Sequence, residues 1–165
     1  MRARAARVQP PRAGARRDGA AAIAVRRVRR DDLAQVIAID AMVTGVAKAD
    51  YWRAVFRRYG GASRTGRHFL VAEAGDDVVG FVIGEVRDWE FGSPPCGWVF
   101  GIDVRPDRRL AGVGARLLDA ICARFREAGI GTVRTLLARD NALVLSFFRS
   151  QGMMAGPFIP LEMDL

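Results

Sequence analysis

Apolar and polar positions along the chain follow two spacings, and together these spacings predict a mixed α/β fold. Short or alternating apolar runs predict strands at residues 23–28, 68–73, 78–86, 98–104 and 133–137, with a final pair within 153–165. Apolar residues three and four positions apart predict helices at residues 31–39, 50–59, 114–126 and 141–150. The order β-α-α-β-β-β-α-β-α-β is typical of one domain with a mixed sheet and helices on both faces.

The junction between the strand at 98–104 and the next helix carries two closely spaced glycines. It reads Arg109-Leu110-Ala111-Gly112-Val113-Gly114. A helix N-terminus gathers unpaired backbone N–H groups and the positive end of the helix dipole, which favours a phosphate there. Glycines allow a ligand to approach the backbone closely, but they also serve tight turns. Spacing alone therefore supports a phosphate site and a plain turn about equally.

Two familiar phosphate motifs are absent from this junction. Leu117 stands where the third glycine of a dinucleotide-binding fingerprint belongs. The sequence contains no Gly-x-x-x-x-Gly-Lys-Ser/Thr motif, and the only lysine of the chain, Lys48, lies far from the glycines. The sequence therefore argues against a dinucleotide site and against an ATP site.

The net charge of +8 resides at the start of the chain. Residues 1–30 hold ten arginines and one acid, a net of +9, which leaves −1 for residues 31–165. Residues 1–22 are rich in Arg, Ala, Pro and Gly, which predicts a disordered tail ahead of a domain at 23–165. Such a tail could contact nucleic acid, act as an organelle transit peptide, or be inert. We favour the inert tail and expect no nucleic-acid binding.

Composition argues against several other classes of protein. No apolar run is long enough to span a membrane, and the N-terminus lacks the apolar region of a secretory signal. Cys96 and Cys122 form neither a disulfide framework nor a metal-ligand spacing, and the one histidine is His68. We therefore expect a cytoplasmic protein that acts without a metal and without a membrane partner.

The glycine junction and a later segment resemble the GNAT superfamily of N-acetyltransferases. The family signature Gln/Arg-x-x-Gly-x-Gly/Ala is matched by Arg109, Gly112 and Gly114. A second pattern, Asn-x-x-Ala-x-x-Leu/Phe-Tyr-x-x-x-Gly-Phe, is matched in part by Asn141, Phe147, Phe148, Gly152 and Met153. The motifs cover about residues 97–153, and the element order agrees from about residue 23 to residue 165. The resemblance implies a single GNAT-like α/β (α+β) domain, whose mostly antiparallel sheet is splayed between its fourth and fifth strands.

The resemblance also implies acetyl-coenzyme A as co-substrate. The backbone N–H groups that would hold its pyrophosphate are those of Arg109, Leu110, Ala111, Gly112, Val113 and Gly114. The pantetheine arm would pair with the fourth strand around Ile102 and Val104, and Asn141 would contact the coenzyme from the following helix. Phe148 stands where many family members place a tyrosine that protonates the leaving thiolate. Its ring would instead pack on the pantetheine arm or in the core.

An N-acetyltransferase needs a group that takes a proton from its acceptor, because an alkylamine has a pKa of about 10 and arrives protonated. Family members often use Glu or Asp. The candidates are Glu85, at the end of the third strand, and Asp103, which strand alternation puts opposite Ile102 and Val104. For both candidates a salt bridge to an arginine is the simpler alternative.

An acceptor pocket has fewer signals in the sequence. Asp88 and Glu90, beside Trp89 and Phe91, could line one, although a solvated loop is the simpler interpretation. The sequence therefore predicts a transferase that moves the acetyl group of acetyl-CoA to a primary amine of a small molecule or protein. The alternative is a non-catalytic acyl-CoA-binding or regulatory domain, and a homodimer is left open.

Overall fold

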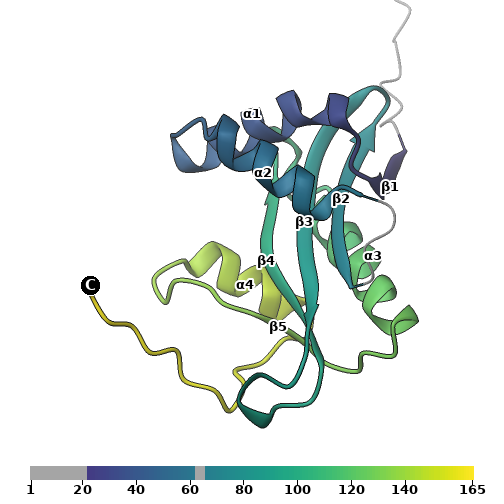
Figure 1. The fold of residues 1–165 in the computed structure, drawn as a ribbon. Coiled ribbons are helices and arrows are strands. Elements are labelled where there is room, and N and C mark those ends of the chain that lie inside the picture. Colours follow the sequence, from purple (N-terminus) through teal and green to yellow (C-terminus); the bar gives the residue numbers. More distant parts are fainter. Residues whose placement is uncertain (1–21, 62–65) are drawn as a thin grey trace, which may run out of the picture.

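Five strands form one sheet at the centre of the fold (Figure 1). The computed structural model describes residues 22–61 and 66–165. The strands are β1 (Ile23–Arg27), β2 (Arg67–Ala74), β3 (Asp77–Arg87), β4 (Cys96–Val104) and β5 (Val133–Thr135). They lie in the order β1-β2-β3-β4-β5, antiparallel from β1 to β4 and parallel between β4 and β5. The expected mixed, mostly antiparallel sheet is confirmed.

Helices cover both faces of the sheet, as the sequence predicts (Figure 1). The α-helices are α1 (Leu33–Thr44), α2 (Ala49–Tyr59), α3 (Val113–Glu127) and α4 (Ala142–Ser150). Three short 3-10 helices are η1 (Arg30–Asp32), η2 (Glu90–Gly92) and η3 (Pro106–Arg108). One buried cluster joins α1 and α2 to the sheet, and a second joins α3 and α4 to its other face.

The side chains of β3 divide between these two clusters because adjacent residues of a strand point to opposite faces. Phe81 and Ile83 belong to the cluster under α1 and α2, whereas Val82 belongs to the cluster under α3 and α4. In the register of β3 with β4, Phe81 lies opposite Asp103 and Val82 lies opposite Ile102. The register therefore puts Asp103 on the α1–α2 face and Ile102 on the α3–α4 face.

β4 and β5 separate soon after they meet. They pair only at Gly97–Val133, Trp98–Arg134 and Val99–Thr135. The Thr135 hydroxyl donates a hydrogen bond to the Val99 carbonyl at 2.8 Å, at the last of these pairs. From Phe100 to Val104, β4 continues without a β5 partner. This is the expected splay between the fourth and fifth strands.

The predicted final strand pair within 153–165 is wrong. The structure assigns no strand after β5 among the described residues, and residues 153–165 form an irregular segment. Phe158 of this segment still lies over Arg134 of β5, and the C-terminal end extends away from the sheet (Figure 1). Pro157 and Pro160 lack the backbone N–H that a sheet ladder needs, and Gly156 adds a flexible point beside Pro157. The strand predicted at 133–137 is also shorter than expected, because pairing stops at Thr135.

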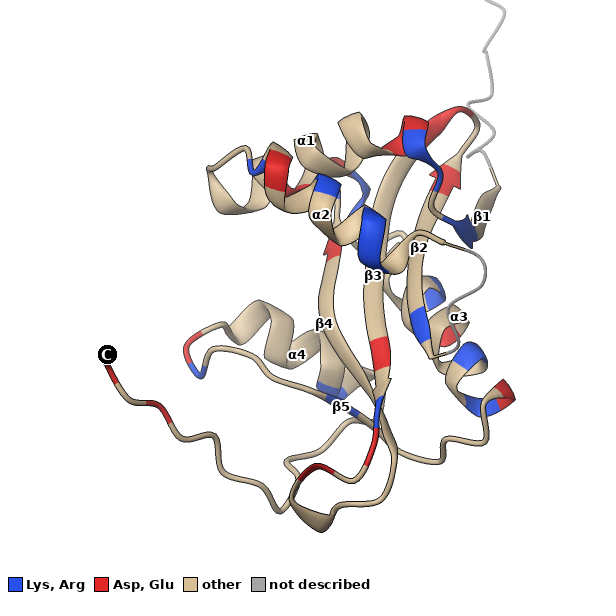
Figure 2. Ribbon diagram, viewed as in Figure 1, with Lys and Arg blue, Asp and Glu red and all other residues tan. Residues whose placement is uncertain are grey.

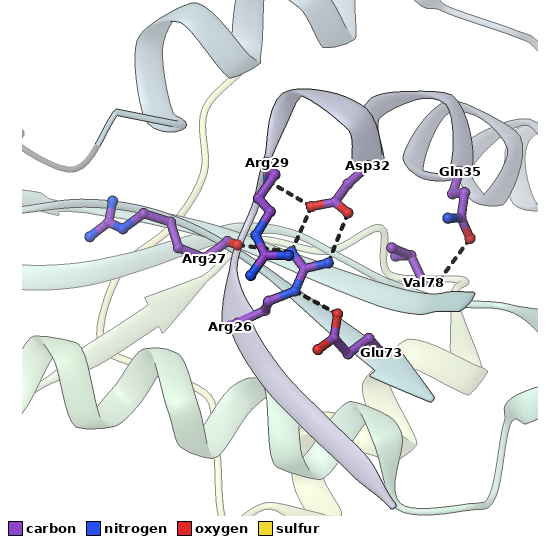
Figure 3. A network of polar contacts seen from close by, with 7 residues as sticks. All are labelled: Arg26, Arg27, Arg29, Asp32, Gln35, Glu73 and Val78. Atoms are coloured by element: carbon purple, nitrogen blue, oxygen red, sulfur yellow. Dashed lines mark hydrogen bonds and ion pairs between the residues drawn. The ribbon is translucent and has the colours of Figure 1, made fainter. Parts of the chain in front are cut away.

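A polar network fixes β1 and η1 to β2 (Figure 3). The Arg26 guanidinium donates to both carboxylate oxygens of Asp32, at 2.7 and 2.9 Å, and to Glu73 at 2.5 Å. The Asp32 carboxylate also accepts the backbone N–H of Arg29 at 2.6 Å. Burial by itself would raise the pKa of Asp32, but the bonds from Arg26 and Arg29 outweigh it and lower that pKa. The buried carboxylate of Asp32 thus connects the start of α1 to β1, at the edge of the sheet.

Acidic and basic positions are mixed over the described residues. Figure 2 shows both colours on α2 and on α3, where they belong to side chains such as Asp50, Arg53, Asp119 and Arg124. The predicted arginine-rich tail falls on residues 1–22, of which 1–21 lie outside the described residues. None of the helices described is long and apolar enough to cross a membrane.

Candidate active site

A cavity of about 350 Å³ opens between the unpaired end of β4, the start of α3 and one side of α4. It lies on the sheet face that carries Ile102 and Val104. Its lining residues from β4, η3 and the following loop are Ile102, Asp103, Val104, Arg108, Arg109, Leu110 and Gly112. Those from α3, α4 and the residue after α4 are Val113, Gly114, Ala115, Leu143, Val144, Phe147 and Gln151. We call it the donor cavity.

The start of α3 supplies the polar wall of the donor cavity. Gly112 is the N-cap residue with φ 75°, a left-handed conformation that glycine adopts without strain. Leu110 has φ 65° and its side chain is fully exposed. The first turn of a helix leaves backbone N–H groups without intrahelical partners, and Arg108 and Arg109 stand beside them. This wall has the chemistry of an anion site.

Gly114 lets α3 and α4 approach each other. A Cβ atom at this position would lie 3.0 Å from the ring of Phe147, which also lines the donor cavity. The second glycine of the junction therefore serves helix packing as well as access to the backbone. Gly112, with φ 75°, supplies the turn, and a phosphate at this junction stays a prediction.

The unpaired end of β4 forms the opposite wall. Ile102, Asp103 and Val104 lie beyond the last β4–β5 pair, so backbone groups on that edge of β4 face the cavity instead of a strand. An open strand edge is a template for an extended ligand that carries amide groups. An elongated ligand could therefore have its anionic end at α3 and its amide chain along β4.

Three of the predicted coenzyme-contacting residues do not line the donor cavity. Ala111 is exposed, and the Asn141 side chain caps α4 by accepting the Val144 backbone N–H at 3.1 Å. Phe148 is 4% exposed and packs in the core beside Phe147, with ring centroids 5.1 Å apart. Of its two predicted positions, Phe148 therefore takes the one in the core.

The residues of α4 that do line the cavity were missed from the sequence. Leu143, Val144, Phe147 and Gln151 lie at helical spacing on one side of α4. That spacing is visible in the sequence, but it does not distinguish a cavity wall from a core-facing stripe. The separation of β4 from β5 is what turns part of this stripe into a wall.

A second cavity, of about 250 Å³, lies on the other face of the sheet between α1, α2 and the strands β3 and β4. We call it the acceptor cavity. Its lining residues are Asp40, Lys48, Tyr51, Trp52, Phe81, Ile83, Phe100, Gly101 and Asp103. Apart from Asp103, the sequence singled out none of them for this role, because they come from separate elements and share no motif.

Asp103 lines both cavities, and it is the one residue that these two linings share. Burial, and after it the negative charge of Asp40, raise the pKa of Asp103 to about 6, while Arg109 and Lys48 act in the opposite direction. A carboxyl with such a pKa is mostly ionised at neutral pH and is a stronger base than an exposed aspartate. Both the position and the pKa of Asp103 are consistent with its predicted role as a base.

Glu85, the other predicted base, lies outside both cavities. Its carboxylate accepts the Tyr59 hydroxyl at 2.9 Å and pairs with Arg87 at 3.3 Å and Arg67 at 3.7 Å. These contacts join α2 to the sheet, which is the salt-bridge alternative that the sequence offered for Glu85.

The loop between β3 and β4 also lies away from both cavities. Asp88, Trp89, Glu90 and Phe91 are exposed, and none of them lines either cavity. The solvated-loop interpretation fits these four residues. Among the residues that the structure describes, no group of His, Cys, Asp and Glu side chains is arranged to hold a metal ion.

Residues 33–153 match the sequence model of the Acetyltransferase (GNAT) family. The aminoglycoside N-acetyltransferase AAC(6′)-Iy in complex with CoA is similar in structure, with a TM-score of 0.75 and 18% identity over 87% of this chain and 95% of that chain. The aminoglycoside antibiotic 6′-N-acetyltransferase AAC(6′)-Ih from Acinetobacter baumannii has a TM-score of 0.72 and 13% identity, covering 87% of this chain and 99% of that one.

A transcriptional regulator from Bacillus halodurans is similar to the same degree, with a TM-score of 0.73 and 19% identity over 87% of this chain and 100% of that chain. At such identities the solved structures show the fold alone. No curated protein matched the sequence.

Proposed function

Because the chain belongs to the GNAT family of acetyltransferases, we propose that it transfers the acetyl group of acetyl-CoA to a primary amine by direct attack on the thioester. The observation that carries this proposal is the position of Asp103, which lines the donor cavity on one face of the sheet and the acceptor cavity on the other. A base at the junction of two cavities suits a reaction in which two substrates meet without a covalent enzyme intermediate.

In this proposal the donor cavity holds acetyl-CoA. The backbone N–H groups from Arg109 to Gly114 bind the pyrophosphate, and Arg108 and Arg109 add positive charge beside it. The two amide groups of the pantetheine arm pair with the open edge of β4 near Ile102 and Val104. The apolar side of α4 covers the arm. AAC(6′)-Iy, which shares this fold, was solved with CoA, and that supports the assignment.

The reaction then needs the amine in its neutral form. Asp103 takes a proton from the ammonium group, and the nitrogen lone pair attacks the thioester carbonyl carbon. A backbone N–H of β4 polarises the carbonyl oxygen. A C–N bond forms, the C–S bond breaks, and the thiolate of CoA leaves with its electron pair. The nitrogen of the intermediate carries two protons; one passes to solvent, and the other stays as the amide N–H of the product.

The thiolate leaves without help from a tyrosine at the position of Phe148. Phenylalanine has no proton to give, and Phe148 is buried in the core. A thiol has a pKa of about 8.5, so its thiolate is a tolerable leaving group at neutral pH. We expect this protein to react more slowly than an enzyme with a general acid, because a general acid raises the rate by about 10²–10⁴-fold.

The acceptor is a primary amine that enters the acceptor cavity as an ammonium ion. Asp103 lines this cavity and favours a cation there. Several structures with this fold belong to aminoglycoside acetyltransferases, whose acceptors are amines, and this supports the amine class. We place the reaction in the cytoplasm, where acetyl-CoA is available.

A panel of amines tests the proposal, with thiol release from acetyl-CoA as the readout and calorimetry for coenzyme binding. We expect acetyl-CoA to bind and at least one primary amine to accelerate thiol release. Tight binding of acetyl-CoA without amine-dependent thiol release would contradict the enzyme and favour the alternative, a regulatory acyl-CoA-binding domain. That alternative is kept because Phe148 lacks the hydroxyl of the family tyrosine.

A further inference from the structure

The acceptor cavity contains an ion pair that the proposed reaction does not use. The Lys48 ammonium lies 2.9 Å from Oδ1 of Asp40, and the other carboxylate oxygen of Asp40 accepts the Trp52 indole N–H at 2.8 Å. The Asp40 side chain is only 4% exposed. Both of its oxygens are therefore already bound by groups of the protein.

Asp103 differs from Asp40 in this respect. Among the described residues, no cationic side chain lies within ion-pair distance of its carboxylate. With Asp40 and Asp103 both ionised and Lys48 protonated, the side chains that line the acceptor cavity carry a net charge of −1. The cavity thus offers one unpaired carboxylate to an incoming substrate.

Lys48 also places a positive charge where a second ammonium group of a substrate would have to bind. It is the only lysine in the chain, it stands directly before α2, and its ammonium lies 5.9 Å from the Tyr51 ring centroid. A polyamine entering this cavity would meet an occupied carboxylate and a repelling ammonium. The repulsion between the two ammonium groups is stronger here than in bulk water because protein atoms replace part of the surrounding water.

The remaining lining residues favour a substrate whose uncharged part is aromatic or apolar. The aromatic rings of Tyr51, Trp52, Phe81 and Phe100 make up much of the wall. The volume of about 250 Å³ lies below the range of about 300–1,000 Å³ typical of pockets for drug-sized ligands. A small body with one ammonium group matches these dimensions and this charge.

We propose that Lys48 determines the acceptor class, because its ion pair with Asp40 leaves Asp103 as the single free carboxylate and restricts the site to small monoamines with an aromatic or apolar body. The same ion pair disfavours polycationic amines. This inference rests on the proposed function, since it names the substrate class of the same site. Lys48 acts on selectivity, and its influence on the chemical step is limited to its charge, which lowers the pKa of Asp103.

The test compares phenethylamine with para-(aminomethyl)phenethylamine, which adds a second ammonium to the same ring, and with kanamycin. The kcat/KM of each amine is measured by thiol release, and its Kd is measured by calorimetry on the CoA-bound protein. For the wild type we expect phenethylamine to be preferred over both polycations by at least about tenfold, the effect of one unit charge at a partly screened site.

Variants that change the number of free carboxylates in the acceptor cavity give the decisive comparison of amine preference. Lys48→Gln frees Asp40 and should reduce the preference for the monoamine about tenfold, whereas Lys48→Arg should keep it. The double variant Asp40→Asn/Lys48→Gln again leaves one free carboxylate and should restore the wild-type preference. Arg53→Gln removes a cation of α2 that lines neither cavity and should leave the preference unchanged. A ratio between two amines cancels general losses of activity or of folded protein.

The outcomes separate this inference from the proposed function. Equal use or equal binding of phenethylamine and the polycations by the wild type would overturn the inference, and so would an unchanged ratio in Lys48→Gln. If no amine releases thiol, the proposed reaction fails. The Kd values then still decide whether Lys48 selects monoamines.

Discussion

Asp103 lies on the part of β4 that continues beyond its last pair with β5, and it lines both cavities. Its carboxyl lies on the α1–α2 face and is partly buried. This burial, together with the negative charge of Asp40, raises its pKa to about 6. A base must be ionised to accept a proton, so its contribution to kcat/KM should rise with pH through about 6. The pH profile of amine acetylation checks this rise. A profile without an inflection near that pH would contradict the role of Asp103.

The Asp103→Asn variant supplies the control. We expect kcat to fall by about 10²–10⁴-fold, the usual contribution of general base catalysis, and the inflection near pH 6 to disappear. The raised pKa means that ionised Asp103 is disfavoured in the folded protein, so the neutral variant should be more stable than the wild type above that pH. Thermal unfolding of both proteins at about pH 7.5, where Asp103 of the wild type is ionised, shows whether a loss of activity comes from the missing base or from a loss of folded protein.

Sequence reasoning at the scale of single residues succeeded where a residue could be placed by strand alternation. Alternation put Asp103 opposite Ile102 and Val104, and the register with β3 agrees. It gave no way to choose between Asp103 and Glu85, because the choice depends on contacts that Glu85 makes with side chains from other elements. The sequence shows Lys48 only as a lysine far from the glycines, since its pairing with Asp40 is a tertiary contact.

The start of α3 is the element on which the donor site depends. Gly112 has φ 75°, and Gly129, just after the same helix, has φ 78°; at both positions a Cβ would have no other atom within 4 Å. Alanine at either position should therefore cost about 1–2 kcal/mol of stability through backbone strain alone. Urea unfolding of Gly112→Ala and Gly129→Ala measures that cost.

Only the Gly112→Ala variant should also bind CoA more weakly. Strain that shifts the start of α3 moves the N–H groups that we propose bind the coenzyme, and we expect a loss of roughly tenfold in affinity, equivalent to about 1.4 kcal/mol. Gly129 lies at the far end of α3 and should keep the wild-type Kd. Equal CoA affinity in the two variants would remove the helix start from the coenzyme site.

The attachment of β1 and η1 to the sheet depends on Asp32. Asp32→Asn breaks its charged bonds with Arg26 and should reduce the free energy of unfolding by about 1–3 kcal/mol at neutral pH. Because the pKa of Asp32 is lowered in the folded protein, this stabilisation is complete above the unfolded pKa of about 3.9. It is lost as pH falls through the folded pKa.

Unfolding of wild type and Asp32→Asn at several pH values checks this sign. The difference between the two proteins should shrink as the solution becomes acidic. Asp31→Asn is the matched control, because Asp31 is the exposed neighbour of Asp32 in η1 and should change stability by less than about 0.5 kcal/mol. A difference that grows with acidity would contradict the network.

Helices and strands were predictable where apolar residues recur at a regular helical or strand spacing. The helices α2, α3 and α4 and the strands β2, β3 and β4 follow the predicted ranges closely, whereas α1 extends beyond its predicted end at residue 39 to Thr44. The prediction of strands after Gly152 was wrong. It rested on apolar residues such as Phe158, Ile159 and Leu161, which are exposed in the structure. Strand formation needs a partner edge, and the sequence does not say whether one is available.

At the scale of the whole molecule, charge divides the chain into two parts. Residues 31–165 are close to neutral and hold the linings of both cavities, whereas residues 1–30 carry +9. Deletion of residues 1–22 should therefore leave CoA binding and amine acetylation unchanged. Filter binding of DNA and RNA before and after the deletion tests the remaining alternative, and a large loss of affinity would show that the tail binds nucleic acid.

In the proposed enzyme, two cavities on opposite faces of the sheet share Asp103 and bring an acetyl donor to an amine. Mass spectrometry of the amine, run beside a thiol assay of the same mixture, tests this arrangement. We predict one acetylated amine for each CoA thiol released by the wild type, and at least about a hundredfold less of both with Asp103→Asn. Thiol release without acetylated amine, or full activity in Asp103→Asn, would contradict it.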